Sequence, residues 1–247
     1  MSPVAIFSIL AVSSLVTSFI SGILGMAGGM ILMGILLSFM SLPAAMLLHG
    51  ISQLASNGGR ALMLRREVQW RVIRGYAVGA AFAVAIFLVT RLVVGKAAAL
   101  ILMGFTPFVA LLLPEKLHLN VEKRGHSFLC GLVCVAISLT AGIAGPILDV
   151  FFVRSKMTRH AVVATKALTQ TLSHLLKIGY FGGVLAIHGS EVSPWLATMM
   201  VVLSFVGTSL SRQVLERITD DAFRKWTRWT VMTLGVMYLV SGVRMLF

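Results

Sequence analysis

Residues 4–40 read VAIFSILAVSSLVTSFISGILGMAGGMILMGILLSFM and contain no Lys, Arg, Asp or Glu. The first charged side chain in the whole sequence is Arg60. One membrane-spanning helix needs about 20 predominantly apolar residues. This stretch is therefore long enough for membrane-embedded helices, and only a glycine-rich turn at Gly25, Gly28 and Gly29 interrupts it. We expect an all-α polytopic membrane protein.

The composition of the whole chain supports the same fold class. Of 247 residues, 58% are hydrophobic and 12% are charged, and the mean hydropathy is +0.95. Soluble domains carry about 25% charged residues, so an ordinary soluble enzyme, a disordered protein and a disulfide scaffold are excluded. No catalytic triad, metalloprotease motif or Walker loop is recognisable, and two cysteines, Cys130 and Cys134, do not make a zinc site. We therefore expect no enzymatic activity, no cofactor and no metal.

A net charge of +13 would suggest a nucleic-acid partner for a soluble protein. Here the basic residues lie between apolar segments, where the positive-inside rule accounts for them. We therefore expect membrane lipid, and no nucleic acid, around this chain. The apolar segments are 4–24, 27–40, 43–64, 72–93, 97–113, 126–145, 160–181, 193–211 and 227–246, with a short piece at 146–153.

The basic residues of the connections predict the topology. Because cytoplasmic loops collect Lys and Arg, all basic clusters are expected on the cytoplasmic side. Segment 126–153 lies between two of them and must enter the membrane and return. By the same logic, 4–40 leaves and returns to the outside, although 4–24 is also long enough to span fully. Both termini are then outside. The four clusters lie at 65–74, 116–124, 154–159 and 212–228.

Two apolar segments share a polar pattern 117 positions apart. The first reads SQLASNGGR at 52–60, and the second reads TQTLSHLLK at 169–177. Gln and Ser recur identically, Ser is matched by Thr, Asn by His, and Arg by Lys. Just upstream, His49 is in register with Lys166. Six polar matches within apolar segments predict an internal repeat.

The repeat and the loop charges together predict an inverted topology. GILG at 22–25 matches GIAG at 142–145, so each half is a glycine-containing broken-helix hairpin followed by three transmembrane helices. Because three is odd, the halves enter the membrane from opposite sides, as in many secondary transporters. We place repeat 1 at about 1–115 and repeat 2 at about 122–247, within one transmembrane domain spanning 1–247.

The repeated polar positions fall on one face of each helix, since residues three and four apart are helical neighbours. Charged side chains on such a face would be costly against lipid, so we expect the two polar stripes to face each other across a protected cavity. The alternative is interhelical hydrogen bonding, worth about 0.6 kcal/mol per bond, which suffices for the serines and threonines. The candidates for binding the oxygens of a small anion are Gln53, Asn57, Gln170 and His174.

The charged candidates within the apolar segments or near their ends are Arg60, Asp149, Lys166 and Lys177. Each cation either adds positive potential to the cavity or snorkels to the nearer interface. Asp149 either pairs with Lys166 or titrates as a proton relay. Because the cations outnumber the acid, the cavity is expected to favour an anion.

The glycines of both hairpins are the remaining site candidates. In the first, Gly25, Gly28 and Gly29 break the helix, which then restarts near Met30. In the second, Gly145 and Pro146 take the corresponding place, and proline suits the first position of a helix. A helix start at membrane depth offers unpaired N–H groups and a positive dipole end to an anion. Close helix packing is the alternative role of the glycines.

GILGMAGG at 22–29, followed by PAA at 43–45 and the polar helix 49–60, resembles the TauE/SafE sulfite exporter family. The resemblance covers nearly the whole chain and is most specific over the first 60 residues. The GPI sequence at 145–147 departs from it, since a second glycine-rich run would be typical there. The resemblance implies a small bacterial inner-membrane protein with two homologous halves that moves sulfite or organosulfur anions, often outward and coupled to an ion gradient.

We therefore expect a secondary transporter that exports sulfite or a sulfonate by alternating access between the two repeats. An anion channel with the same residues lining a pore is the alternative. Proton coupling through His174 fits the range in which histidine titrates. The sequence leaves open which anion and coupling ion are used, the direction of transport, and whether the protein forms a homodimer.

Overall fold

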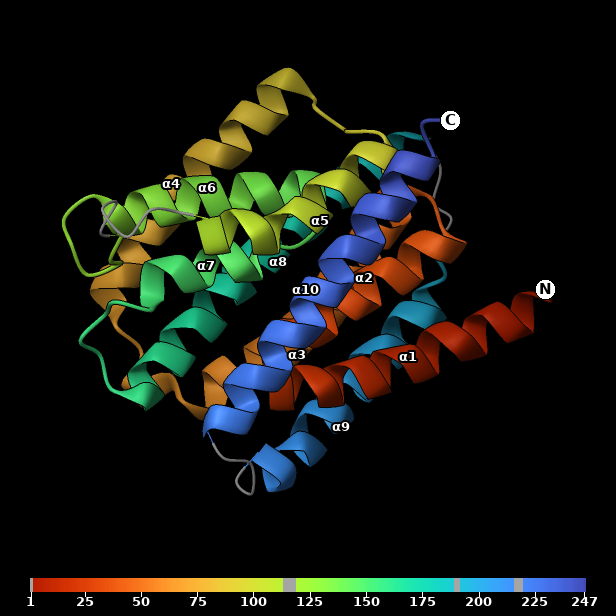
Figure 1. The fold of residues 1–247 in the computed structure, drawn as a ribbon. Coiled ribbons are helices and arrows are strands. Elements are labelled where there is room, and N and C mark those ends of the chain that lie inside the picture. Colours follow the sequence, from red (N-terminus) through yellow and green to blue (C-terminus); the bar gives the residue numbers. More distant parts are fainter. Residues whose placement is uncertain (1, 113–118, 189–191, 216–219) are drawn as a thin grey trace.

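The computed structural model describes residues 2–112, 119–188, 192–215 and 220–247 (Figure 1). These residues form α-helices, one short 3₁₀ helix and connections, with no strand among them. The all-α fold is thus confirmed. The elements are α1 (Pro3–Leu24), α2 (Ala27–Phe39), α3 (Leu42–Met63), η1 (Arg65–Glu67), α4 (Trp70–Thr90), α5 (Lys96–Leu112), α6 (His126–Ala141), α7 (Gly145–Phe152), α8 (Arg159–His188), α9 (Pro194–Leu215) and α10 (Asp220–Arg244).

The predicted segments differ most from the helices at three ends. α6 ends at Ala141 and not at 145, because Gly142 adopts a left-handed φ of +82°. α8 continues to His188, and α10 begins at Asp220. The extra residues of α8 begin with the two glycines Gly182 and Gly183, and those of α10 include the charged residues Asp220, Asp221, Arg224 and Lys225, so the predicted segments underestimate the length of both helices.

Two pairs of helices form broken-helix hairpins. In the first, α1 and α2 are joined by Gly25, at φ +66°, and Met26. In the second, residues 142–144 join α6 to α7. The far ends of the second hairpin are held together, because the Val121 N–H donates to the Phe151 carbonyl oxygen at 2.9 Å. Segment 126–153 therefore returns to the end of the protein from which it starts, as the basic loops predict.

Several helices are suited to a bilayer. Among the described residues, three helices are long and apolar enough to cross a membrane: Val4–Leu24, Trp70–Thr90 and Pro194–Ser211. Three shorter helices are also apolar: Ala27–Phe39, Lys96–Leu112 and His126–Ala141. α1 is thus both long enough to span and one arm of a hairpin. Outward-facing side chains such as Phe82, Ile86 and Phe205 are exposed, which is the distribution expected where lipid surrounds a multi-pass membrane protein.

The helices pair mainly across the two halves of the chain. α1 packs most extensively on α9, α4 on α6, α3 on α8, and α5 on α10. Glycines bring the backbones close: a Cβ at Gly207 would lie 2.3 Å from the Leu15 carbonyl oxygen, and one at Gly79 would lie 1.9 Å from the Phe128 carbonyl oxygen. The longer arm of each hairpin therefore lies against a helix of the other half, through contacts that only glycine permits.

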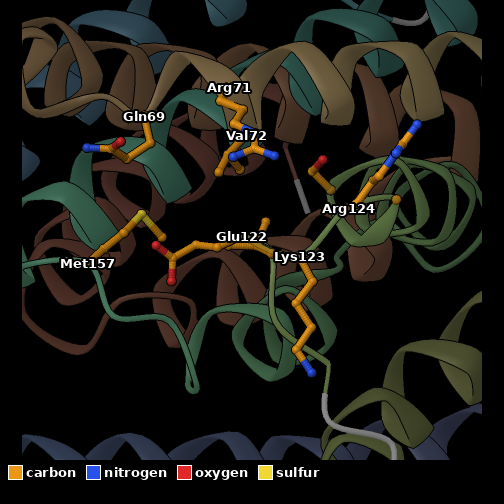
Figure 2. Close-up of a pocket in the computed structure, with 10 residues that line it drawn as sticks. Gln69, Arg71, Val72, Glu122, Lys123, Arg124 and Met157 are labelled. Carbon is orange, nitrogen blue, oxygen red and sulfur yellow. The ribbon is translucent and has the colours of Figure 1, made fainter.

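Three of the basic loops meet at one end of the bundle. One cavity of about 280 Å³ is lined by Gln69, Arg71 and Val72, by residues 121–125 and Ser127, and by Met157 (Figure 2). The Lys156 N–H donates to Glu122 Oε2 at 2.6 Å and ties two of these loops together. The two chain ends lie at the opposite, right-hand side of Figure 1. The residues 113–118 and 216–219, which include parts of two basic clusters, lie outside the described residues.

Candidate anion-binding site

The polar faces of α3 and α8 meet where these helices pack together. A Cβ at Gly50 would lie 3.5 Å from the backbone carbonyl oxygen of His174, so the two backbones approach closely there. The buried polar side chains at this contact are His49, Gln53 and Asn57 on α3, and His174 and Lys177 on α8. The two stripes therefore face each other in the protein interior.

His49 and Lys177 link the two hairpins. Lys177 Nζ lies 2.7 Å from His49 Nδ1 and 2.9 Å from the Gly142 carbonyl oxygen. His49 Nε2 lies 3.0 Å from the Gly29 carbonyl oxygen. Because an ammonium can only donate, Nδ1 accepts from Lys177, and Nε2–H donates to Gly29. One hydrogen-bonded chain thus runs from α2 through α3 and α8 to the turn between α6 and α7.

The charge of Lys177 is not balanced by an acid among the described residues. Its side chain is fully buried, and the salt bridge found in the described part of the chain joins two other residues. An ammonium has three N–H donors, and the described residues give this one two acceptors. Burying an unpaired charge costs free energy. A bound anion would supply both the missing acceptor and the missing charge.

Two buried polar atoms lie next to the hydrogen bonds of His49 and Lys177: Gln53 Nε2 and His174 Nδ1. Neither has a partner among the described residues. Gln53 Oε1 accepts from Asn57 Nδ2 at 3.3 Å, so the free Gln53 Nε2 is a donor. The His174 ring stands edge-on to the His49 ring, with their centroids 5.5 Å apart. Buried polar groups are nearly always hydrogen-bonded, so these two atoms indicate the place of a polar ligand.

The starts of α2 and α7 meet beside these atoms. A Cβ at Gly145 would lie 2.6 Å from the Met26 Cβ, and a Cβ at Gly29 would lie 3.4 Å from Gln53 Oε1. α7 begins at Gly145 with Pro146 in its first turn, as the sequence predicts. Each helix start carries N–H groups without intrahelical partners and the positive end of its dipole. The two hairpins therefore bring two such starts together.

The predicted restart of the first hairpin near Met30 is wrong by one turn. α2 begins at Ala27, and Gly28 and Gly29 belong to its first turn. A Cβ at Gly28 would lie 2.0 Å from the Thr17 carbonyl oxygen. This glycine therefore lets α2 lie against α1, the packing role given as the alternative, and it does not interrupt the helix.

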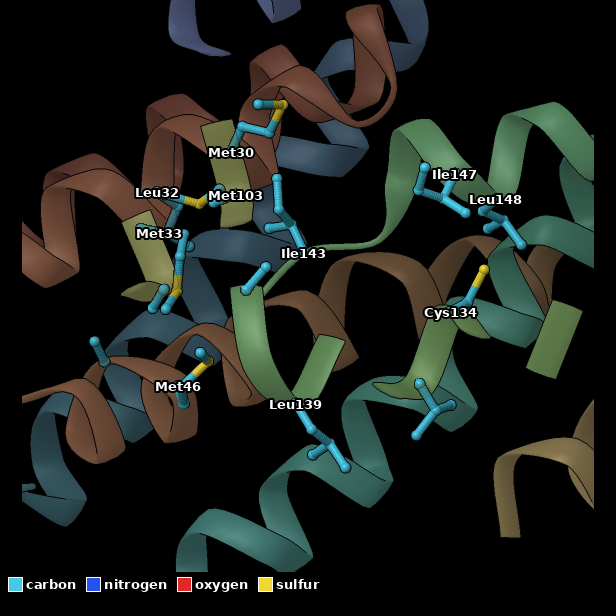
Figure 3. Packing of buried hydrophobic residues seen from close by; sticks show 14 of the residues in the cluster. Met30, Leu32, Met33, Met46, Met103, Cys134, Leu139, Ile143, Ile147 and Leu148 are labelled. Atoms are coloured by element: carbon cyan, nitrogen blue, oxygen red, sulfur yellow. The ribbon is translucent and has the colours of Figure 1, made fainter. Parts of the chain in front are cut away.

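Methionines and an isoleucine enclose the second turn. A Cβ at Gly142 would lie 2.8 Å from Met33 Cε and 3.1 Å from Met46 Sδ. Figure 3 shows Ile143 directed towards Met30 and the buried side chains around it. Flexible methionine side chains adapt to irregular surfaces, so a turn of non-helical backbone is packed without a rigid complementary shape.

The other ionisable candidates do not take part in the hydrogen bonds of His49 and Lys177. Lys166 forms a salt bridge with Asp149, as one of the two alternatives predicts, and both side chains are partly exposed. Arg60 is half-buried, and its Nη2 donates to the Ser21 carbonyl oxygen at 3.4 Å. Gln170 is half-buried on α8. The structure thus brings Gln53, Asn57, His174 and Lys177 together, whereas Lys166, Asp149 and Arg60 have other partners.

Hydroxyl groups next to the site hold helices together. Ser56 on α3 bonds Thr208 on α9 at 2.7 Å, and Ser173 on α8 bonds Tyr76 on α4. Ser14 of α1 bonds Ser52 and Ser204. This is the structural role expected for the serines of the polar stripes.

Sequence reasoning did not include His49, Gly142 or Met26 among the binding residues. His49 had a signal, since it is in register with Lys166 in the repeat. Gly142 had one too, since it is matched with Gly22 in the repeat. The contacts of Gly142 with Lys177 and of Met26 with Gly145 are long-range, and the sequence does not show them.

A family model described as "Sulfite exporter TauE/SafE" matches residues 10–238, nearly the whole chain. The chain belongs to the TauE/SafE family. No curated protein and no solved structure matches it at a significant level. Membership of TauE/SafE identifies the chain as one of a family of membrane exporters of sulfite or related anions, and not one of a family of enzymes. The multi-pass helical fold agrees with that class.

Proposed function

We propose that this chain is a secondary transporter that exports sulfite or a sulfonate across the bacterial inner membrane. The observation that carries the proposal is the buried Lys177 ammonium, which lacks an acidic partner among the described residues and lies in the same α3–α8 contact as two unpartnered polar atoms. The oxygens of the anion would accept from Lys177, Gln53 Nε2 and His174. The adjoining starts of α2 and α7 would add backbone donors, and Asn57 would hold the Gln53 amide in place.

The choice of helix partners supports two inverted repeats, at about 1–115 and 122–247. In that arrangement α1 corresponds to α6, α2 to α7, and so on to α5 and α10. The α1–α9 pair then has α4–α6 as its counterpart, while α3–α8 and α5–α10 are their own counterparts. A two-fold rotation that swaps the two halves would turn each helix pair into its counterpart. Inverted repeats related in this way are the arrangement used for alternating access.

The His49–Lys177 hydrogen bond would control the reorientation. Rocking one repeat against the other requires the α3–α8 contact to change, and this bond joins the two helices at that contact. If it broke in the empty protein, the buried ammonium would lose an acceptor and gain none. A bound anion supplies that acceptor. We therefore infer that the loaded protein reorients faster than the empty one.

Orientation and coupling belong to the same proposal. The end of the bundle that carries the basic loops would face the cytoplasm, with both termini periplasmic and lipid around the exposed apolar faces. His174 would carry the coupled proton, since its Nδ1 is free to accept one next to the bound anion. Asp149 would stay paired with Lys166.

Counterflow in liposomes tests the proposal and separates a transporter from a channel. Liposomes that contain the purified protein and excess unlabelled sulfite should accumulate labelled sulfite transiently, and the rate should saturate. A channel would equilibrate the label without such an overshoot. Gln53→Ala should reduce the rate, whereas Gln213→Ala, an exposed glutamine on α9, should not. Counterflow with carboxylates but not with sulfur anions would contradict the substrate and leave the site in place.

A further inference from the structure

A cavity of about 280 Å³ lies at the basic end of the bundle, apart from the α3–α8 site. It is formed by the start of α4, the connection before α6 and the connection after α7, and Figure 2 shows the side chains around it. Arg71 and Val72 line it from α4, Val121, Glu122 and Arg124 from the connection before α6, and Met157 from the connection after α7. The cavity thus joins segments from both halves of the chain.

The charges around this cavity favour an anion. Arg71, Lys123 and Arg124 contribute three positive charges, and Glu122 contributes one negative charge. The Glu122 carboxylate already accepts the Lys156 N–H at 2.6 Å, so it is held towards the neighbouring loop. Guanidinium groups bind phosphate oxygens with two parallel hydrogen bonds.

The cavity also lies at the depth of lipid headgroups. Arg71 and Val72 are the second and third residues of the candidate membrane span Trp70–Thr90. Trp70 is 58% exposed, and exposed tryptophans at span ends are typical of the membrane–water interface. Val72 and Val121 are buried and give the cavity an apolar floor. A ligand with a charged head and an apolar body matches this combination.

We propose that this cavity binds the phosphate headgroup of an anionic phospholipid. Arg71 and Arg124 hold the phosphate, and the acyl chains lie along the exposed face of α4. Basic cavities between transmembrane helices near the interface bind such headgroups in this way. Because the lining comes from both halves, bound lipid would hold α4 and the loop before α6 together. The proposal does not depend on which anion the α3–α8 site transports.

Thermal unfolding of the purified protein in mild detergent tests this site. Phosphatidylglycerol should raise the unfolding temperature saturably, and phosphatidylcholine should not. In the variant Arg71→Gln/Arg124→Gln, the half-maximal lipid concentration should rise by about fivefold or more for each arginine removed. The matched control is Arg65→Gln/Arg66→Gln, which removes two exposed charges at the same end but outside the cavity and should titrate like the native protein.

Equal effects of the two double variants would overturn the proposal, because a general surface potential would then explain the lipid effect. Inorganic phosphate stabilising the protein as well as phosphatidylglycerol does would also overturn it, in favour of a soluble oxyanion. If Arg71→Gln/Arg124→Gln does not fold, Met157→Trp serves instead, since it fills the cavity without changing its charge. Retention of the native lipid response in Met157→Trp would contradict the site.

Discussion

The two broken-helix hairpins are built alike but are held in place by different means. In the α1–α2 hairpin, Gly28 lets the two arms touch backbone to backbone, and α1, α2 and the turn between them carry no charged residue. The His49 and Arg60 side chains of α3 bind this hairpin through its backbone, at the carbonyl oxygens of Gly29 and Ser21. In the α6–α7 hairpin, two side chains of α8 hold the shorter arm and the turn: Lys166 binds Asp149, and Lys177 binds the Gly142 carbonyl oxygen.

This difference suggests that the two hairpins respond differently to a bound anion. The close contact between the backbones of α1 and α2 depends on the absence of a side chain at Gly28, so we expect the two arms of the first hairpin to stay together. Contacts made by lysine side chains can be exchanged for other acceptors, so the second hairpin can respond to a ligand. We therefore expect the first hairpin to move little during transport and the second to change its contacts when an anion binds.

The largest expected effect is on the first hairpin. Gly28→Ala would place a Cβ 2.0 Å from the Thr17 carbonyl oxygen, where backbone cannot move away cheaply. We expect a loss of about 3 kcal/mol in the free energy of unfolding, measured as a lower unfolding temperature and a lower yield of monodisperse protein. Gly179→Ala is the control, since its Cβ meets nothing within 4 Å. A native unfolding temperature for Gly28→Ala would show that the first hairpin is not rigid.

Lys177→Met should have the next largest effect, and on transport more than on folding. It keeps the length of the side chain but removes the charge and its donors. Loss of a buried charge partner costs at least 2 kcal/mol of binding, so the transport rate at low substrate concentration should fall about 30-fold or more. The exposed Lys156→Met should leave that rate unchanged. A native transport rate in Lys177→Met would show that the contact of Lys177 with the second hairpin takes no part in anion binding.

The two repeat-related glutamines should differ in effect. Gln53 is buried with an unpartnered donor, whereas Gln170 is half-buried. A hydrogen bond to a charged ligand is worth about 1.5–3 kcal/mol, so Gln53→Ala should weaken sulfite binding about tenfold or more and Gln170→Ala by less than about threefold. Competition binding on purified variants measures both. The opposite order would mean that the second half, and not the first, supplies the amide donor.

The smallest expected effect concerns the Lys166–Asp149 pair. Because both side chains are partly exposed, solvent screens the attraction, and a double-mutant cycle of Lys166→Met and Asp149→Leu should give a coupling of about 0.5 kcal/mol. Chemical unfolding of the two single variants and the double variant gives this value. A coupling above about 2 kcal/mol would mean that this pair, rather than Lys177, fixes the second hairpin.

The sequence was sufficient to predict the helices and which faces of α3 and α8 meet. Apolar length predicts the spans, and polar residues three and four apart predict the stripe that holds Gln53 and His174. The return of segment 126–153 followed from the loop charges. These features depend on local pattern, which a single sequence contains.

The precise partners inside the site could not be predicted in the same way. Whether Lys177 or Lys166 occupies the centre depends on how α8 is rotated against the second hairpin, and both lie on the same stripe. The meeting of Gly145 with Met26 depends on how the two hairpins approach each other. The role of Gly28 was inferred as a break because glycine disfavours helices, whereas packing against Thr17 decides it.

The pairing of α1 with α9 has a consequence for biosynthesis. α1 ends at Leu24 and α9 begins at Pro194, so 170 further residues must be made before α1 meets its main partner. At about 5–20 residues per second, α1 waits on the order of ten to thirty seconds in the membrane with the face that packs on α9 uncovered. Ribosome pausing between the two halves should therefore lower the yield of folded protein, and the first half made alone should be an early target for membrane quality control.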